Sequence, residues 1–226
     1  MLASVEAEIQ EDMTMRASEI QFLENLRSGL DLDDCERLNR SILLMIYAHL
    51  EGHVKFCLDV YVRFLNEESV RASAVLPILS ALTLHSEFAK LRNPQTSEGL
   101  PSELRDFSEL RKLSVEKSFI EGAREFEDRV VLIDERIVDL ESNLKPKVLR
   151  KNLYRLGICQ SFLAPLQDNL NRLLGKRNNI AHGASSVGIG DAELTELKVC
   201  ATEIASRVSE GVLSAVSRSA HLSLAR

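Results

Sequence analysis

The sequence predicts an all-α protein built from long helices. Hydrophobic residues recur at three- and four-residue steps over several stretches, which is the spacing of one helix face. The 226 residues include only ten glycines and five prolines, so few turns interrupt these stretches. No stretch alternates hydrophobic and polar residues in the manner of a half-buried strand. We therefore expect an antiparallel helical bundle with long helices and a long C-terminal helix.

The first half of the chain is expected to form two long helices and a shorter one. The first covers residues 2–26, and the second runs from an aspartate cap, Asp33 or Asp34, to about Asn66. The middle of the second helix, SILLMIYAHL, is almost entirely apolar, so this helix should be central. The third covers residues 75–91 and has a proline near its start, where a missing N–H does no harm.

The central part of the chain carries a weaker helical pattern than its flanks. Residues 93–114 hold two prolines and show no sustained periodicity, so we expect a loop with one short helix at most. This loop is either a functional insertion or a plain linker. A heptad-like series of apolar residues follows and predicts a helix that packs along another helix. Its members are Phe119, Phe126, Val130, Ile133, Ile137, Leu140 and Leu144.

Three further helices are expected in the last third of the chain. A connector at residues 142–147 leads into a basic helix that ends near Leu156-Gly157. Pro165 then opens a helix over residues 166–182, and Gly183 stops it because glycine readily takes the left-handed conformation of a helix end. After GASSVGIG, Asp191 is expected to cap the final helix, which lies within residues 190–226.

Composition narrows the class of protein. The length allows one large domain or two small ones, and it allows a real core. The chain has no run of about 18 apolar residues that would predict a membrane span. The N-terminal residues lack the order of a signal peptide, and the four cysteines form no C-x-x-C pair. We therefore expect a cytoplasmic protein with reduced thiols, in which Cys57 and Cys159 are inert packing residues.

The charge is unevenly distributed along the chain. The net charge is −6, which by itself argues against a nucleic-acid partner. Residues 144–182, however, carry about +7, and residues 1–143 carry about −12. A basic strip on an acidic body suits phosphate binding, although a solvated helix face would have the same composition. The residues that we expect to contact RNA phosphates are Lys147, Arg150, Lys151, Arg172 and Lys176.

One short segment combines residues that could carry chemistry. Residues 176–183 read KRNNIAHG and bring Arg177, Asn178 and His182 close together. A neutral histidine is a competent general acid or base near pH 7, and an arginine can hold a phosphate and stabilise transition-state charge. Asn178 could orient either group or the ribose. Spacing alone favours a simpler interpretation, in which Arg177 and His182 only provide positive charge at the end of a helix.

These groups would suffice for metal-free cleavage of RNA, in which the 2′-OH attacks the adjacent phosphate. The reaction needs two acid or base groups, and the segment supplies one histidine. A dimer that brings two copies of the segment together would supply the second. The sequence contains no G-x-x-x-x-G-K-[ST], G-x-G-x-x-G or G-x-S-x-G motif that would indicate a different chemistry.

The run RNNIAHG, from Arg177 to Gly183, resembles the R-x4-6-H signature of the HEPN superfamily, in which a polar residue follows the arginine. YAHLEGHVK at residues 47–55 and SNLKPKVLRKNLYRLGI at 142–158 resemble a bacterial branch of HEPN-like nucleases, so the resemblance covers about 35–185. It implies a single HEPN-like helical domain over 1–226, with its core at about 32–185. It also implies a homodimer with metal-independent endoribonuclease activity and a role as a toxin or in phage defence.

One position departs from the pattern of some HEPN toxins. In the members silenced by nucleotide transfer, a tyrosine lies two residues past the histidine. Ala184 occupies that position, which argues against this form of regulation.

Glu51 lies in the apolar part of the second helix, where an unpaired charge would be costly to bury. Pairing with Arg177 or His182 would remove this cost, so we assign Glu51 to the site. An exposed pair with Lys55, four residues on, is the alternative. His49 and His53 have the spacing to share a metal, but HLEGH is not H-E-x-x-H and no further ligand cluster is evident. We expect no metal and no cofactor.

The leading hypothesis is a cytoplasmic homodimer that cleaves RNA. His182 would act as acid or base and Arg177 would hold the phosphate, with Asn178 and Glu51 in support. RNA, a second copy of the chain and an antitoxin or defence-system protein are the expected partners, and no membrane is involved. The alternative is a non-catalytic helical module that binds RNA, a nucleotide or a protein. A third interpretation is an antitoxin-like or scaffolding subunit.

Overall fold

The computed structural model describes residues 1–94, 100–183 and 188–223. The chain divides into two compact units, of which unit 1 comprises residues 1–64 and 135–220 and unit 2 comprises residues 65–134 and 221–226. All regular elements of the described residues are helices, and the strand-like pairing there is limited to two isolated bridges. The predicted all-α fold is therefore confirmed. The single domain expected over residues 1–226 stays a prediction.

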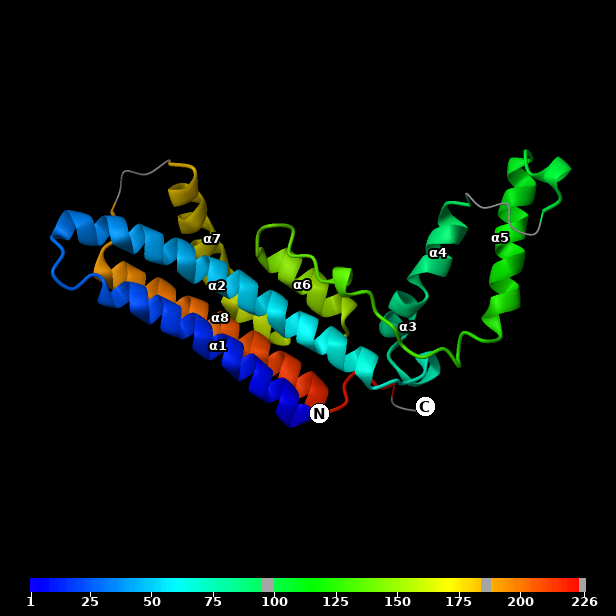
Figure 1. Cartoon of the computed structure of the whole chain (residues 1–226), viewed down its shortest axis with the longest axis horizontal. Coiled ribbons are helices and arrows are strands. Elements are labelled where there is room, and N and C mark those ends of the chain that lie inside the picture. Colours follow the sequence, from blue (N-terminus) through cyan, green and yellow to red (C-terminus); the bar gives the residue numbers. More distant parts are fainter. Residues whose placement is uncertain (95–99, 184–187, 224–226) are drawn as a thin grey trace. The chain divides into compact units, whose positions relative to one another are not determined.

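Three long helices run side by side in unit 1 (Figure 1). They are α1 (Leu2–Asn25), α2 (Leu32–Glu67, of which the first 33 residues belong to unit 1) and α8 (Asp191–Ser217). α1 is antiparallel to α8. Glu24, near the end of α1, pairs with Lys198, near the start of α8, whereas the earlier Asp12 is linked through His53 to the later Ser209. The expected long C-terminal helix is present, and so is the long central helix.

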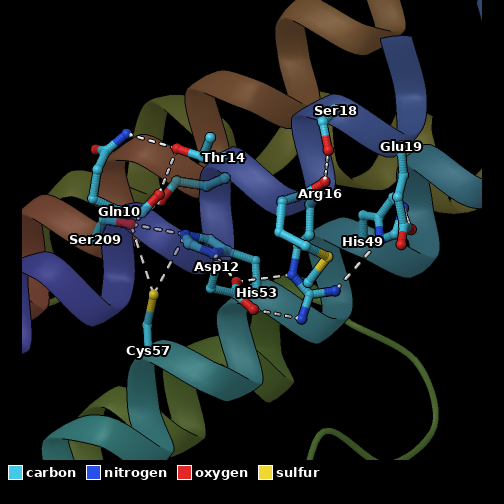
Figure 2. Close-up of polar contacts among 12 residues, drawn as sticks. Gln10, Asp12, Thr14, Arg16, Ser18, Glu19, His49, His53, Cys57 and Ser209 are labelled. Atoms are coloured by element: carbon cyan, nitrogen blue, oxygen red, sulfur yellow. Dashed lines mark hydrogen bonds and ion pairs between the residues drawn. The ribbon is translucent and has the colours of Figure 1, made fainter. Parts of the chain in front are cut away.

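A buried polar network joins these three helices (Figure 2). His53 of α2 donates from Nδ1 to Asp12 Oδ2 at 2.6 Å, and its Nε2 lies 2.9 Å from Ser209 Oγ on α8. Arg16 donates from Nε and Nη2 to the two oxygens of Asp12, each at 2.8 Å. Burial opposes ionisation of Asp12, but the hydrogen bonds from Arg16 and His53 outweigh it and lower the pKa of this carboxyl. The network therefore ties specific positions of α1, α2 and α8 to one another, which favours a single register of the three helices.

Two shorter helices complete unit 1. α6 (Pro146–Arg155) begins with a proline at its first position, as expected for a residue without an N–H. A 3-10 turn, η4 (Ser161–Leu166), contains Pro165 and leads into α7 (Gln167–Ala181), which packs on α8. The buried residues of α7 are Leu170, Leu173 and Leu174, three of the four leucines that the sequence places on one side.

Unit 2 is made of short helices and turns. The helix expected over residues 75–91 is divided into α3 (Pro77–Thr83) and α4 (His85–Arg92). α5 (Ser108–Ala123) packs on α4 and begins inside the stretch expected to be a loop. Two 3-10 turns also belong to this unit. η1 (Ala72–Ala74) precedes α3, and η2 (Ser102–Leu104) lies between α4 and α5. Three half-buried aromatic rings, those of Phe88, Phe119 and Phe126, pack against one another in this unit.

The prediction of a helix from the heptad-like series at 119–144 is wrong. α5 ends at Ala123, and the chain then continues to Pro146 without an α-helix, with one 3-10 turn, η3 (Glu135–Ile137). Val131 and Ile133 are buried while Leu132 between them is 70% exposed, which is the alternation of an extended chain. Two asparagine side chains bond main-chain groups of this segment. Asn66 bonds the N–H and the carbonyl of Ile133, and Asn152 bonds the N–H and the carbonyl of Asp139.

The expected aspartate caps are also displaced. α2 begins at Leu32, and the carboxylate of Asp31 accepts the N–H of Asp34 at 2.9 Å, so Asp31 caps this helix in place of Asp33 or Asp34. α8 is preceded by Gly190, and Asp191 is its first residue. The Asp191 carboxylate instead forms an ion pair with Arg27 and accepts a hydrogen bond from Asn39.

Candidate functional site

The motif of residues 176–183 lies at the C-terminal end of α7 in unit 1. The buried leucines of α7 hold the helix on α8, and this leaves the last turn half-buried or exposed. His182 is the C-terminal cap, and Gly183 follows in the left-handed conformation with a φ of 67°. The predicted glycine stop is therefore present. Ala184, on which the argument about nucleotide transfer depends, lies outside the described residues.

Arg177 is held by neighbours from three parts of unit 1. Its Nη1 donates to Asn178 Oδ1 at 2.9 Å and to Asn143 Oδ1 at 3.3 Å. Its guanidinium carbon lies over the ring of Tyr47 in α2, 5.2 Å from the ring centre, which is a cation–π arrangement. Asn178 thus contacts Arg177 directly.

Glu51 lies one turn after Tyr47 on α2 and is half-buried. Burial raises the pKa of its carboxyl, and the nearby positive charge of Arg177 partly offsets this rise. The alternative partner, Lys55, instead forms an ion pair with Asp59 at 2.6 Å. Arg177 therefore acts on Glu51 through its charge at a distance.

His182 is exposed at the end of the helix. Its main-chain N–H donates to the carbonyl of Asn178 at 3.0 Å, which continues the helical hydrogen bonding by one residue. In residues 1–94, 100–183 and 188–223, no side chain forms a hydrogen bond with its imidazole. The ring is therefore open to a ligand or to a second protein surface.

The five basic residues expected to contact RNA differ in their surroundings. Lys151, Arg172 and Lys176 are paired with Glu141, Glu196 and Glu193, respectively, at 2.5 to 2.8 Å. Lys147 and Arg150 are exposed on α6, and the described part of the chain offers them no acidic partner. These ion pairs reduce the positive potential of α7 more than that of α6.

The two histidines with metal-like spacing on α2 are directed at other groups (Figure 2). His53 is bonded within the network of Asp12 and Ser209, and His49 Nε2 lies 2.9 Å from Glu19 Oε2. No group of three or more metal-binding side chains occurs in the residues that the structure describes. Both rings therefore serve the packing of the helices.

The two cysteines that we expected to be inert differ. Cys57 is buried, and burial raises the pKa of its thiol to about 12, as an inert residue requires. Cys159 is exposed, and hydrogen bonds with Ser161 lower its pKa. The prediction for Cys159 is therefore wrong, since an apolar sequence context did not lead to burial.

Two residues of the site did not follow from the sequence. Two signals pointed to Tyr47: the stretch that resembles HEPN-like nucleases, and its place one turn before Glu51. Asn143 lies in a connector, 34 residues before Arg177, and no spacing rule links the two. Long-range contacts of this kind depend on how α2, the connector and α7 pack together.

Comparison with known proteins identifies the family. The family model described as RiboL-PSP-HEPN matches residues 11–213. No curated protein and no solved structure matches the chain. In the described ranges, no helix is both long and apolar enough to cross a membrane. The family match spans α2 with Tyr47 and Glu51, the connector with Asn143, and the motif on α7. The chain belongs to the RiboL-PSP-HEPN family, and thus to the HEPN superfamily.

Proposed function

We propose that this protein is a metal-independent endoribonuclease whose active site is formed by two copies of the Arg177–His182 motif in a homodimer. The observation that carries the proposal is the pairing of an oriented cation with an open imidazole on one helix end. Arg177 is held by two amide oxygens and an aromatic ring, and His182 is exposed five residues later. Membership of the HEPN superfamily supports a nuclease-like or RNA-related module.

The proposed reaction is attack of a ribose 2′-oxygen on the adjacent phosphorus. One histidine takes the 2′-OH proton as the P–O bond forms, and a second gives a proton to the departing 5′-oxygen. The products are a 2′,3′-cyclic phosphate and a free 5′-OH. Arg177 would stabilise the extra negative charge on the phosphorane oxygens. A second copy of His182 would supply the second proton-transfer group.

Glu51 has a supporting role in this proposal. Its half-buried carboxylate is near enough to influence Arg177 electrostatically without an ion pair that would block the guanidinium. The exposed Lys147 and Arg150 on α6 would contact backbone phosphates beyond the cleaved bond, with smaller contributions from Lys151, Arg172 and Lys176 because these are already paired.

Incubation of purified protein with single-stranded RNA in excess EDTA tests the activity. Wild type should cleave and leave 2′,3′-cyclic phosphate ends, whereas DNA of the same sequence should stay intact. His182→Ala should lose about a hundredfold or more of the rate, as expected for removal of an acid–base group. His85→Ala is the matched control, since His85 is exposed in unit 2 and should cleave like wild type. Equal cleavage by His182→Ala and wild type would refute the proposal.

The dimer is tested by light scattering together with the dependence of rate on protein concentration. The rate per chain should fall on dilution below the concentration at which the dimer dissociates. A monomer that cleaves RNA at a constant rate per chain would refute the composite site. RNA binding by both wild type and His182→Ala, without cleavage by either, would identify a non-catalytic binding module instead.

The biological role that we propose is that of a toxin or a defence effector, held in check by an antitoxin or defence-system protein. Expression of wild type should then arrest growth, and expression of His182→Ala should not. Harmless expression of wild type, together with recovery of a stable hetero-complex, would favour a scaffolding subunit.

A further inference from the structure

The guanidinium of Arg177 is hydrogen-bonded to described residues through one of its nitrogens. Its Nη1 donates to the side-chain oxygens of Asn178 and Asn143, which occupies both N–H groups of that nitrogen. In the described part of the chain, no acceptor is hydrogen-bonded to Nε or Nη2 of Arg177. These two nitrogens form an edge with parallel N–H donors, which is the geometry that binds two phosphate oxygens at once.

Tyr47 provides a fixed surface beneath this guanidinium. The side chain is 1% exposed in the middle of α2, and its hydroxyl accepts the main-chain N–H of Leu144 at 2.8 Å. The hydrogen bond limits rotation of the ring out of the helix packing. The ring face can therefore stack on Arg177 without being reordered when a ligand arrives.

Asn143 is directed at Arg177 by an unusual turn. The two residues before it, Glu141 and Ser142, have φ values of 54° and 57°, in a region that side chains other than glycine rarely adopt. The turn is closed by main-chain bonds from Asn143 to Leu140 at 3.0 Å and from Lys145 to Asn143 at 2.8 Å. The same connector holds Leu144 on Tyr47, so the ring and the amide are coupled.

We propose that Tyr47 and Asn143 are positioning residues, which orient Arg177 so that its Nε–Nη2 edge is presented to a phosphate of the RNA. The assignment rests on the proposed ribonuclease function and adds the residues that prepare its phosphate-binding group. Neither side chain touches the reacting atoms. Their contribution is to remove rotamers of Arg177 before the substrate binds, which lowers the entropy cost of reaching the transition state.

Three variants test this proposal in the full-length protein. Asn143→Ala and Tyr47→Leu should each lower kcat/KM about tenfold, mainly through kcat, because a misaligned arginine still binds the substrate but stabilises the transition state less. Tyr47→Phe keeps the ring face and loses only the hydrogen bond to Leu144, so its kcat/KM should fall less than that of Tyr47→Leu and stay within about threefold of wild type. Asn171→Ala is the matched control, since Asn171 is exposed on α7 and should leave kcat/KM unchanged.

A second measurement is independent of catalysis. In wild type, the Nε–Hε group of Arg177, assigned by its absence in Arg177→Lys, should give a resolved NMR signal that shifts when inorganic phosphate is added. In Asn143→Ala and Tyr47→Leu the signal should move toward that of a freely rotating arginine and respond less to phosphate. Thermal unfolding of each variant identifies any that are not folded.

The outcomes separate the two proposals. If RNA is cleaved and the folded Asn143→Ala retains kcat/KM within about twofold of wild type, the positioning assignment is overturned while the ribonuclease stands. If wild type cleaves no RNA, the NMR signal decides: a phosphate-responsive Arg177 that loses its order in both variants upholds the assignment. An identical Arg177 signal in wild type and Asn143→Ala overturns it. The result for Tyr47→Leu is used only if this variant folds. If it does not fold, the result for Asn143→Ala alone decides.

Discussion

Replacement of Asp12 by alanine should strongly destabilise the helical bundle of unit 1. The carboxylate accepts three charge-assisted hydrogen bonds, two from Arg16 at 2.8 Å and one from His53 at 2.6 Å. Its side chain is 7% exposed and that of His53 is 2% exposed, so water cannot readily replace the lost partner. The substitution leaves a buried ring nitrogen and a cation without their acceptor (Figure 2).

The size of the loss follows from these contacts. A hydrogen bond to a charged group contributes about 1.5–3 kcal/mol, and removal of one partner of a buried ion pair costs about 3–5 kcal/mol. Arg16 is 21% exposed and can be partly hydrated in the variant, and the carboxylate itself is no longer desolvated. We therefore expect Asp12→Ala to lower the free energy of unfolding by about 3 kcal/mol, at the lower end of that range.

Urea unfolding followed by circular dichroism at 222 nm measures this difference. The matched control is Glu210→Ala on α8, which also removes one negative charge and breaks an ion pair. Glu210 is 63% exposed and pairs with an exposed Arg207, so its replacement should change the free energy of unfolding by about 0.5 kcal/mol or less. A loss below about 1 kcal/mol for Asp12→Ala would refute the expectation that loss of this carboxylate strongly destabilises the bundle.

Three further predictions concern pH, packing and reactivity. Burial lowers the pKa of His49 below its ordinary value of 6.5, so the unfolded chain binds this proton more tightly and the free energy of unfolding falls as pH drops below 6.5. His49→Gln should flatten this slope in urea titrations between about pH 7.5 and 5.5, and an unchanged slope would contradict the prediction. A Cβ on Gly211 would lie 2.8 Å from the Phe162 ring, so Gly211→Leu should cost about 1–3 kcal/mol in the same assay, and a neutral result would argue against the close approach. A thiol reagent should modify the exposed Cys159 in the native protein and reach Cys57 only after unfolding, and mass spectrometry that finds equal labelling of both would refute this.

The long helices could be predicted from the sequence because their apolar residues repeat at the spacing of a helix face. α1 and α7 begin and end within one residue of the expected limits, and Gly183 ends α7 as expected. The same rule failed at residues 119–144. The apolar spacing there is compatible with a helix, but the main-chain groups of Ile133 and Asp139 are bonded by the side chains of Asn66 and Asn152. A periodicity argument cannot detect hydrogen bonds that come from distant residues.

The candidate site, like the fold, could be predicted from the sequence only in part. By itself the sequence determined the fold class, the family resemblance and the motif with Arg177 and His182, because these depend on residues that are neighbours along one helix. Only the tertiary structure decided that Tyr47 and Asn143 hold Arg177, and that the polar residues of α1, α2 and α8 meet in one buried network. The physical reason is that the direction of a side chain is set locally, whereas its partner is set by the packing of whole helices.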